Sequence, residues 1–289
     1  MRKAPTPSLR LAIFALSFLF SRCGTYSGLY QSPLPTVSAP YTVIPLKSDS
    51  LRSATYISGG ITEGGANEDL SDNLLALTGS IYRSHNFGHF QGFYGVNASI
   101  GSYYVRSHPY VTWNAINNAM INAAAGGKFF GGYGASGGID FVHPIFRGSE
   151  WRVLGLSFSL QNEFGDYGRF RKALPDSAAG TIFHNNLIGV LGLSTEFAFK
   201  LRHGMLGYKL ILARDILNGS NQYKGIDVKD KTADRRVTDM AYFGQVLSLT
   251  HNRFTGSFQF NASYYTINAR LGGSYRLGQR KHSSTILKP

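Results

Sequence analysis

Apolar residues alternate with glycine, serine and other small polar residues in about ten stretches between Ser53 and Leu277. The stretch from Leu154 to Gln161 shows the pattern most clearly, because every second residue in it is leucine or phenylalanine. Successive side chains of a β-strand point to opposite faces, so this pattern is typical of a strand with one apolar and one polar face. Short and long connectors alternate between the stretches up to the last hairpin, near Thr266, which is short although it falls at a long-loop position. The alternation predicts a series of antiparallel hairpins, and an even number of strands returns both ends of the series to the same side.

Ten such strands, with no long helical stretch between them, predict an all-β fold. The expected architecture is a single closed antiparallel up-and-down β-barrel that crosses a membrane. Abundant glycine (34 residues) and aromatic residues (13%), with only 16% charged residues, agree with that class of fold. The strands are expected at approximately 53–62, 73–83, 88–105, 127–143, 151–164, 186–200, 205–216, 238–250, 254–264 and 267–277.

The chain before the predicted barrel divides into an export signal and a linker. Residues 1–22 begin with basic residues and continue into the apolar run Leu11–Phe20, which is too short to span a membrane as a helix. Residues 23–52 contain four prolines without periodicity and predict an extended tether. The barrel is then expected to occupy residues 53–278, followed by a basic tail at residues 279–289.

The only cysteine, Cys23, lies three residues after the apolar run and has no partner for a disulfide. The order of basic start, apolar core and Ser21-Arg22-Cys23-Gly24 resembles a bacterial lipobox, in which the cysteine becomes the lipidated first residue. Arg22 departs from this pattern, because glycine or alanine usually precedes the cysteine. Two interpretations follow: lipidation at Cys23, or an incidental thiol in a leader that is removed.

Ionisable residues also fall on the predicted inward face of the strands. If Arg202 and His203 form a two-residue turn, Glu196 lies directly opposite Lys209. We expect the inward charges to pair with one another and to plug the lumen; the alternative is a solute path lined by these charges. The expected lumenal ion network consists of Asp140, Glu196, Lys200, Lys209, Arg270 and Arg276.

Motifs of catalysis or metal binding do not fall on suitable elements. Gly132–Gly137 matches a dinucleotide-binding pattern and Gly134–Gly138 a nucleophile-elbow pattern, yet no helix is expected after either. The histidines are scattered, so we expect no metal site, no cofactor and no catalytic residue. If the chain were instead a hydrolase acting on protein, lipid A or phospholipid at the outer rim, the candidate residues would be Asp166, Asp176, His184, Asp215 and Asp239.

The formal net charge of +13 would suggest nucleic acid as a partner of a soluble protein. Here many basic residues fall at the ends of predicted strands, where anionic lipid headgroups are the nearer partner. We therefore expect outer-membrane lipids as partners, with lipopolysaccharide or other envelope proteins as further candidates, and no nucleic acid.

With these features together, the whole chain resembles the outer-membrane β-barrel lipoproteins of Bacteroidetes. The resemblance is carried by Cys23-Gly-Thr-Tyr26, by Pro45-Leu-Lys47 and by Gly131-Gly-Tyr-Gly134. It implies a porin-like barrel in the bacterial outer membrane, anchored by a lipid. It implies no activity, because the group has no generally assigned one.

Three hypotheses for the function remain open at this point. The sequence favours a structural or accessory component of the cell surface without catalysis, and the rim hydrolase is the second hypothesis. The third is a soluble barrel that binds a lipid inside, and it would place its apolar residues in the interior. The directions of Leu154, Phe158, Leu210 and Phe258 separate the first hypothesis from the third.

Overall fold

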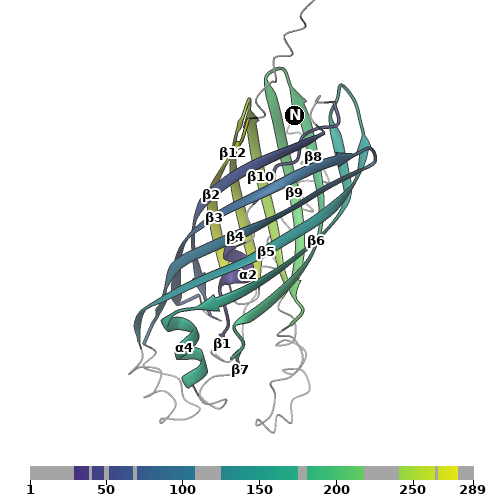
Figure 1. Ribbon diagram of the computed structural model, residues 1–289. Helices are drawn as coiled ribbons and strands as arrows, with labels where there is room; N and C mark the ends of the chain where they lie inside the picture. The colour runs from purple at the N-terminus through teal and green to yellow at the C-terminus, as the bar shows by residue number, and fades with distance from the viewer. Residues whose placement is uncertain are drawn as a thin grey trace, which may run out of the picture.

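Within the residues that the structure describes, ten antiparallel strands form a closed β-barrel (Figure 1). The computed structural model describes residues 29–38, 41–48, 52–67, 70–107, 125–174, 181–217, 241–263 and 266–278. The barrel strands are β2 (Ser53–Ala66), β3 (Asp72–Phe87), β4 (Phe90–Val105), β5 (Gly126–Pro144), β6 (Glu150–Phe164), β8 (Leu187–Leu201), β9 (Gly204–Asp215), β10 (Ala241–His251), β11 (Phe254–Ser263) and β12 (Thr266–Arg276). Each strand pairs with the strands before and after it, and β12 pairs with β2 to close the barrel.

The predicted up-and-down barrel is therefore confirmed, strand for strand. The predicted register of the β8–β9 hairpin is also confirmed, because Glu196 lies opposite Lys209. The alternation is interrupted on β6, where the pairing with β8 shifts between Arg152 and Gly155. Such a bulge adds a residue to one strand and reverses which residues face inward beyond it.

The outer face of the barrel is apolar. Leu154, Phe158 and Phe258 are 56%, 45% and 47% exposed, and Leu210 is partly exposed while its neighbour Lys209 is buried. This arrangement is the reverse of a soluble lipid carrier, which would turn these side chains inward. An apolar outer face around a polar interior is the arrangement of a transmembrane β-barrel of the outer-membrane type.

The two ends of the barrel differ in their connectors. Four short turns lie at one end, which we call the short-turn end, at residues 88–89, 145–149, 202–203 and 252–253. The opposite end carries the longer connectors, together with the two-residue connection between β11 and β12, and we call it the long-loop end. Strand β2 begins and β12 ends at the short-turn end, as predicted for an even number of strands. In bacterial barrels short turns face the periplasm and long loops face outward.

Smaller elements lie at the long-loop end or inside the barrel (Figure 1). Helix α4 (Asp166–Ala173) and strand β7 (Thr181–Ile182) belong to the connector between β6 and β8. Strand β1 (Leu29–Tyr30) and helix α2 (Leu34–Val37) belong to the segment before the barrel. None of the helices in the described ranges is long and apolar enough to cross a membrane.

The segment before the barrel differs most from its prediction. We expected residues 23–52 to form an extended tether, but residues 29–38 and 41–48 lie inside the barrel, and we call them the plug. Their apolar side chains fill the lumen, because the barrel interior offers them the burial that a tether in water would not. The predicted leader, Cys23 and the basic tail 279–289 lie outside the described residues.

Buried apolar side chains of the molecule gather in the lumen, in two clusters that join plug and wall. In one, Leu34 and Val37 of the plug lie in a cluster with Phe130 on β5. In the other, nearer the short-turn end, Val43 of the plug shares a cluster with Tyr82 on β3. The plug is therefore part of the folded core rather than an appendage to it.

Candidate functional site

The plug begins at the long-loop end, where β1 pairs in parallel with β7. The amide of Phe183, just after β7, donates to the Tyr30 carbonyl over 2.9 Å. Tyr30 is 1% exposed, and its ring meets the Phe170 ring of α4 edge-on at a centroid distance of 5.3 Å. These contacts hold the start of the plug next to α4 (Figure 1).

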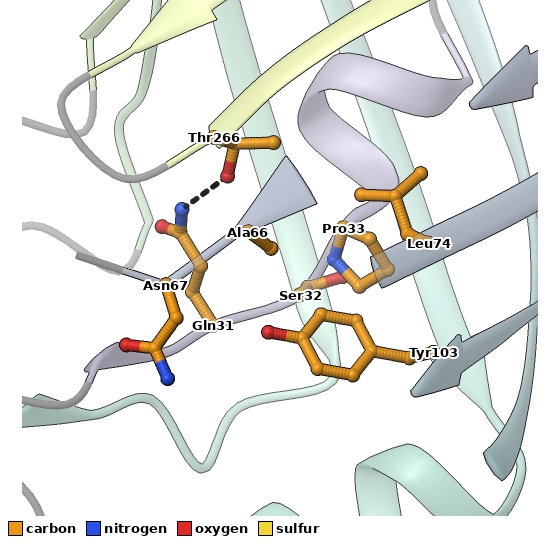
Figure 2. Close-up of a pocket in the computed structure, with 8 residues that line it drawn as sticks. All are labelled: Gln31, Ser32, Pro33, Ala66, Asn67, Leu74, Tyr103 and Thr266. Atoms are coloured by element: carbon orange, nitrogen blue, oxygen red, sulfur yellow. Dashed lines mark hydrogen bonds between the residues drawn. The ribbon is translucent and has the colours of Figure 1, made fainter. Parts of the chain in front are cut away.

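The next residues of the plug fit closely against the ends of the barrel strands, as Figure 2 shows. The side-chain amide of Gln31 donates to the Thr266 hydroxyl of β12 over 3.5 Å. Ala66, Leu74 and Tyr103 line the same small pocket, whose volume of about 10 Å³ is room for a single water molecule. Little space therefore remains between plug and wall at this level.

Helix α2 fills the barrel further in, and the wall is shaped to receive it. Leu34 is fully buried against Gly132 of β5. A Cβ atom added to Gly132 would lie 2.4 Å from Leu34 Cδ1, closer than side chains approach one another. A side chain at position 132 would force Leu34 to move, which gives the first glycine of the motif Gly132–Gly137 a role in packing.

Side chains of the wall bind the plug backbone at the end of α2. The Asn261 amide donates to the Thr36 carbonyl over 3.1 Å. The Thr78 hydroxyl and the Arg270 guanidinium donate to the Val37 carbonyl over 3.2 and 3.1 Å. Because carbonyls at the C-terminal end of a helix lack helical partners, these three side chains satisfy acceptors that burial would otherwise leave unpaired.

Arg152 on β6 links the barrel wall to the middle of the plug. Its side chain is buried, and Nη1 lies 2.7 Å from Glu196 Oε2. Arg152 Nε donates to Gln91 Oε1 and Nη2 to the Ile44 carbonyl of the plug, each over 2.8 Å. The Tyr41 hydroxyl of the plug donates to the other oxygen of Glu196 over 2.6 Å. One buried ion pair thus binds two plug residues.

The last residues of the plug reach the short-turn end. The Val43 amide donates to the Tyr82 hydroxyl over 2.8 Å. The Lys200 ammonium donates to the Ser48 hydroxyl over 3.0 Å, and this hydroxyl donates to the Gly148 carbonyl over 3.1 Å. Wall residues therefore contact the plug from one end of the barrel to the other.

Four of the six residues predicted for the lumenal ion network are buried in the lumen, and they are Asp140, Glu196, Lys209 and Arg270. Glu196 forms a salt bridge, but with Arg152, although Lys209 lies opposite it in the register. Within the described residues, Lys209 and Arg270 form no salt bridge, and Arg270 binds a plug carbonyl instead. Of these four residues, Glu196 therefore pairs with a charge of the wall and Arg270 contacts the plug.

The other two predicted network residues, Lys200 and Arg276, lie at the short-turn end. Lys200 is exposed and binds Ser48 of the plug. Arg276 is half-buried at the last position of β12, opposite Tyr56 of β2. Both belong to the end of the barrel rather than to its middle.

The sequence does not single out Arg152, because regular alternation from Leu154 places the even positions of this strand on the apolar outer face. The bulge between Arg152 and Gly155 reverses that assignment, so Arg152 is buried while Leu154 is 56% exposed. The charges at positions 150 and 152 could have indicated the bulge from the sequence. Regular alternation would turn both Glu150 and Arg152 toward lipid, where a charged side chain is destabilising, and both are in fact buried.

A cavity of about 70 Å³ remains beside the plug. Ser38 and Thr42 of the plug line it, together with Asn97 and Lys209, which are 6% and 8% exposed. Among the described residues neither polar atom of the Asn97 amide has a hydrogen-bond partner. At about 10–15 Å³ for each water, the cavity has room for roughly five water molecules, which would satisfy this amide.

A second buried ion pair fixes α4 to the barrel. Arg171 Nη2 lies 2.7 Å from Glu163 Oε2 on β6, and both side chains are fully buried. Tyr167 of α4 stacks on Tyr103 of β4 at a centroid distance of 4.0 Å. Burial raises the pKa of the Tyr167 phenol well above its usual range, because the charged form would lose its solvation. Helix α4 is thus held firmly beside the start of the plug.

The residues predicted for a rim hydrolase lie in different surroundings. Asp166 is exposed on α4, Asp215 is buried at the end of β9, and His184 is partly exposed before β8. Asp176 and Asp239 lie outside the described residues. In the part of the chain that the structure describes, no three His, Cys, Asp or Glu side chains are grouped as a metal site would require.

Comparisons with known proteins add a likeness of fold. No family model and no curated protein matches the chain. Among solved structures, the translocator domain of the autotransporter NalP from Neisseria meningitidis is 10% identical, with a TM-score of 0.40 over 80% of this chain and 91% of that one. An outer membrane channel from Pseudomonas putida F1 is 8% identical, with a TM-score of 0.42 over 82% and 100%. These scores assign no family, activity or partner.

Proposed function

We propose that the chain is an outer-membrane barrel closed by its own N-terminal segment, with a structural or accessory role at the cell surface. The observation that carries this proposal is the plug, which wall side chains bind at every level from the long-loop end to the short-turn end. A lumen filled in this way leaves no continuous path for solutes between the described strands.

The energetics favour a plug that stays in place. Full burial of a large apolar side chain stabilises by about 1.5–3 kcal/mol, and Leu34, Val37 and Ile44 are each at most 1% exposed. Each neutral hydrogen bond contributes about 0.5–1.5 kcal/mol more. Withdrawing the plug would also leave the Arg152–Glu196 pair without two of its hydrogen bonds.

The outer surface supports membrane lipids as partners. Its apolar side chains match hydrocarbon, and aromatic pairs such as Phe254 and Tyr275 (centroid distance 4.8 Å) lie near the short-turn end, where aromatic girdles meet headgroups. Exposed basic residues such as Arg202 lie at the same end, where each contributes about 1 kcal/mol next to anionic lipid. Lipopolysaccharide or another envelope protein would contact the barrel at the long-loop end.

We further propose that the protein is a lipoprotein of the Bacteroidetes type, acylated at Cys23. The support is the order of basic start, apolar run and cysteine in the sequence. Metabolic palmitate labelling should mark the wild type and leave Cys23→Ala unlabelled. Equal labelling of both would contradict acylation at this residue.

Electrical recording in planar lipid bilayers tests the closed lumen. The purified protein should give no steady ion current, because the plug fills the barrel. A variant in which a glycine-serine linker of equal length replaces residues 29–48 should give stepwise currents. Heat-modifiable migration in gels shows whether each variant retains a folded barrel. A steady current through the wild type, as large as that through the variant, would contradict the proposal.

A further inference from the structure

We infer that the plug enters the barrel from the extracellular side, so that Leu29 lies at the outer surface and a lipid on Cys23 would enter the outer leaflet. This inference rests on the proposed function, because it takes the short-turn end as periplasmic. The even number of strands brings both ends of the barrel to the short-turn end, whereas the plug places the start of the described chain at the opposite end.

The direction of the plug carries the inference. Its first residues pair with β7 and contact Thr266, and both lie at the long-loop end. Its middle binds the Arg152–Glu196 pair. Its last described residue, Ser48, contacts Lys200 and Gly148 at the short-turn end, where β2 begins at Ser53. The chain therefore runs through the lumen from the long-loop end to the short-turn end before the first barrel strand.

The length of the chain bounds the position of Cys23. Cys23 lies six positions before Leu29, and a fully extended chain covers at most about 3.6 Å per position, or about 22 Å in all. The apolar band of a transmembrane barrel is itself about 25 Å tall. From the long-loop end, Cys23 therefore reaches the nearer leaflet and not the periplasmic one.

Accessibility of a peptide tag on intact cells tests this inference. One variant carries the tag between Gly28 and Leu29, and the matched control carries it after Pro289, beyond the end of β12. We expect antibody to bind the first tag on intact cells and the second only after the outer membrane is permeabilised. Binding of the first tag only after permeabilisation would overturn the inference.

The same cells separate this inference from the proposed function. If both variants fractionate with the outer membrane and migrate as heat-modifiable barrels, a hidden N-terminal tag contradicts the direction of the plug alone. If neither variant forms an outer-membrane barrel, the proposed function fails, and the inference fails with it. An exposed C-terminal tag with a hidden N-terminal one would reverse the assigned orientation of the barrel.

Discussion

Arg152 and Glu196 form the buried ion pair that joins the barrel wall to the plug. Each binds the other and each also binds the plug, through Ile44 and Tyr41. In a buried pair of this kind, removal of one partner leaves an uncompensated charge in a medium that solvates it poorly. Lys209, by contrast, forms no salt bridge within the described residues although it lies opposite Glu196.

We therefore expect unequal effects of two substitutions. Glu196→Ala should lower the free energy of unfolding by about 3–5 kcal/mol, because Arg152 loses its partner. Lys209→Met, which keeps the length of the side chain and removes its charge, should lower it much less. Urea unfolding in lipid vesicles measures both. Effects of the same size would show that the charge of Lys209 contributes as much to stability as that of Glu196, which contradicts the expected difference.

At the scale of elements, the barrel strands could be predicted from the sequence because their periodicity is local. Within each strand, the alternation of apolar and polar residues indicates which side chains face outward. The length of each short turn indicates the register of its hairpin. The plug has no such period: prolines interrupt it, and its partners lie far away in the chain. Its burial could have been suspected only from Val43, Ile44 and Leu46, three apolar residues that a solvated tether does not need.

The fit between α2 and β5 gives a prediction at this scale. Gly132→Leu should lower the free energy of unfolding by about 1–3 kcal/mol, because its side chain overlaps Leu34. Combining it with Leu34→Ala should recover part of the loss, since the shorter side chain frees the space, and a double-mutant cycle measures the coupling.

Gly256→Leu is the matched control for that cycle. A Cβ atom at Gly256 would meet nothing within 4 Å, so this variant should unfold like the wild type. If Gly132→Leu is equally harmful with and without Leu34→Ala, the two positions are not in contact. In that case α2 does not lie against β5.

At the scale of the whole molecule, the plug fills the lumen of the barrel. The apolar outer face and the alternating connectors were predictable, and they set the place and orientation of the barrel. The filled lumen was predicted as well, but from ion pairs of the wall rather than from a segment of chain. Bulges such as the one at Arg152 explain part of that difference, because they move charges from the predicted outer face to the interior.

The central claim is that the plug (residues 29–38 and 41–48) occupies the lumen, and a disulfide tests it most directly. Leu34 Cγ lies 3.2 Å from the position of a Cβ atom on Gly132, close to the separation that a disulfide requires. In a Cys23→Ser background, Leu34→Cys with Gly132→Cys should form a disulfide in the folded outer-membrane protein, identified by mass spectrometry of its linked peptides. Leu34→Cys with Gly256→Cys should form none. Two free, reactive thiols at positions 34 and 132 of a folded barrel would contradict the claim.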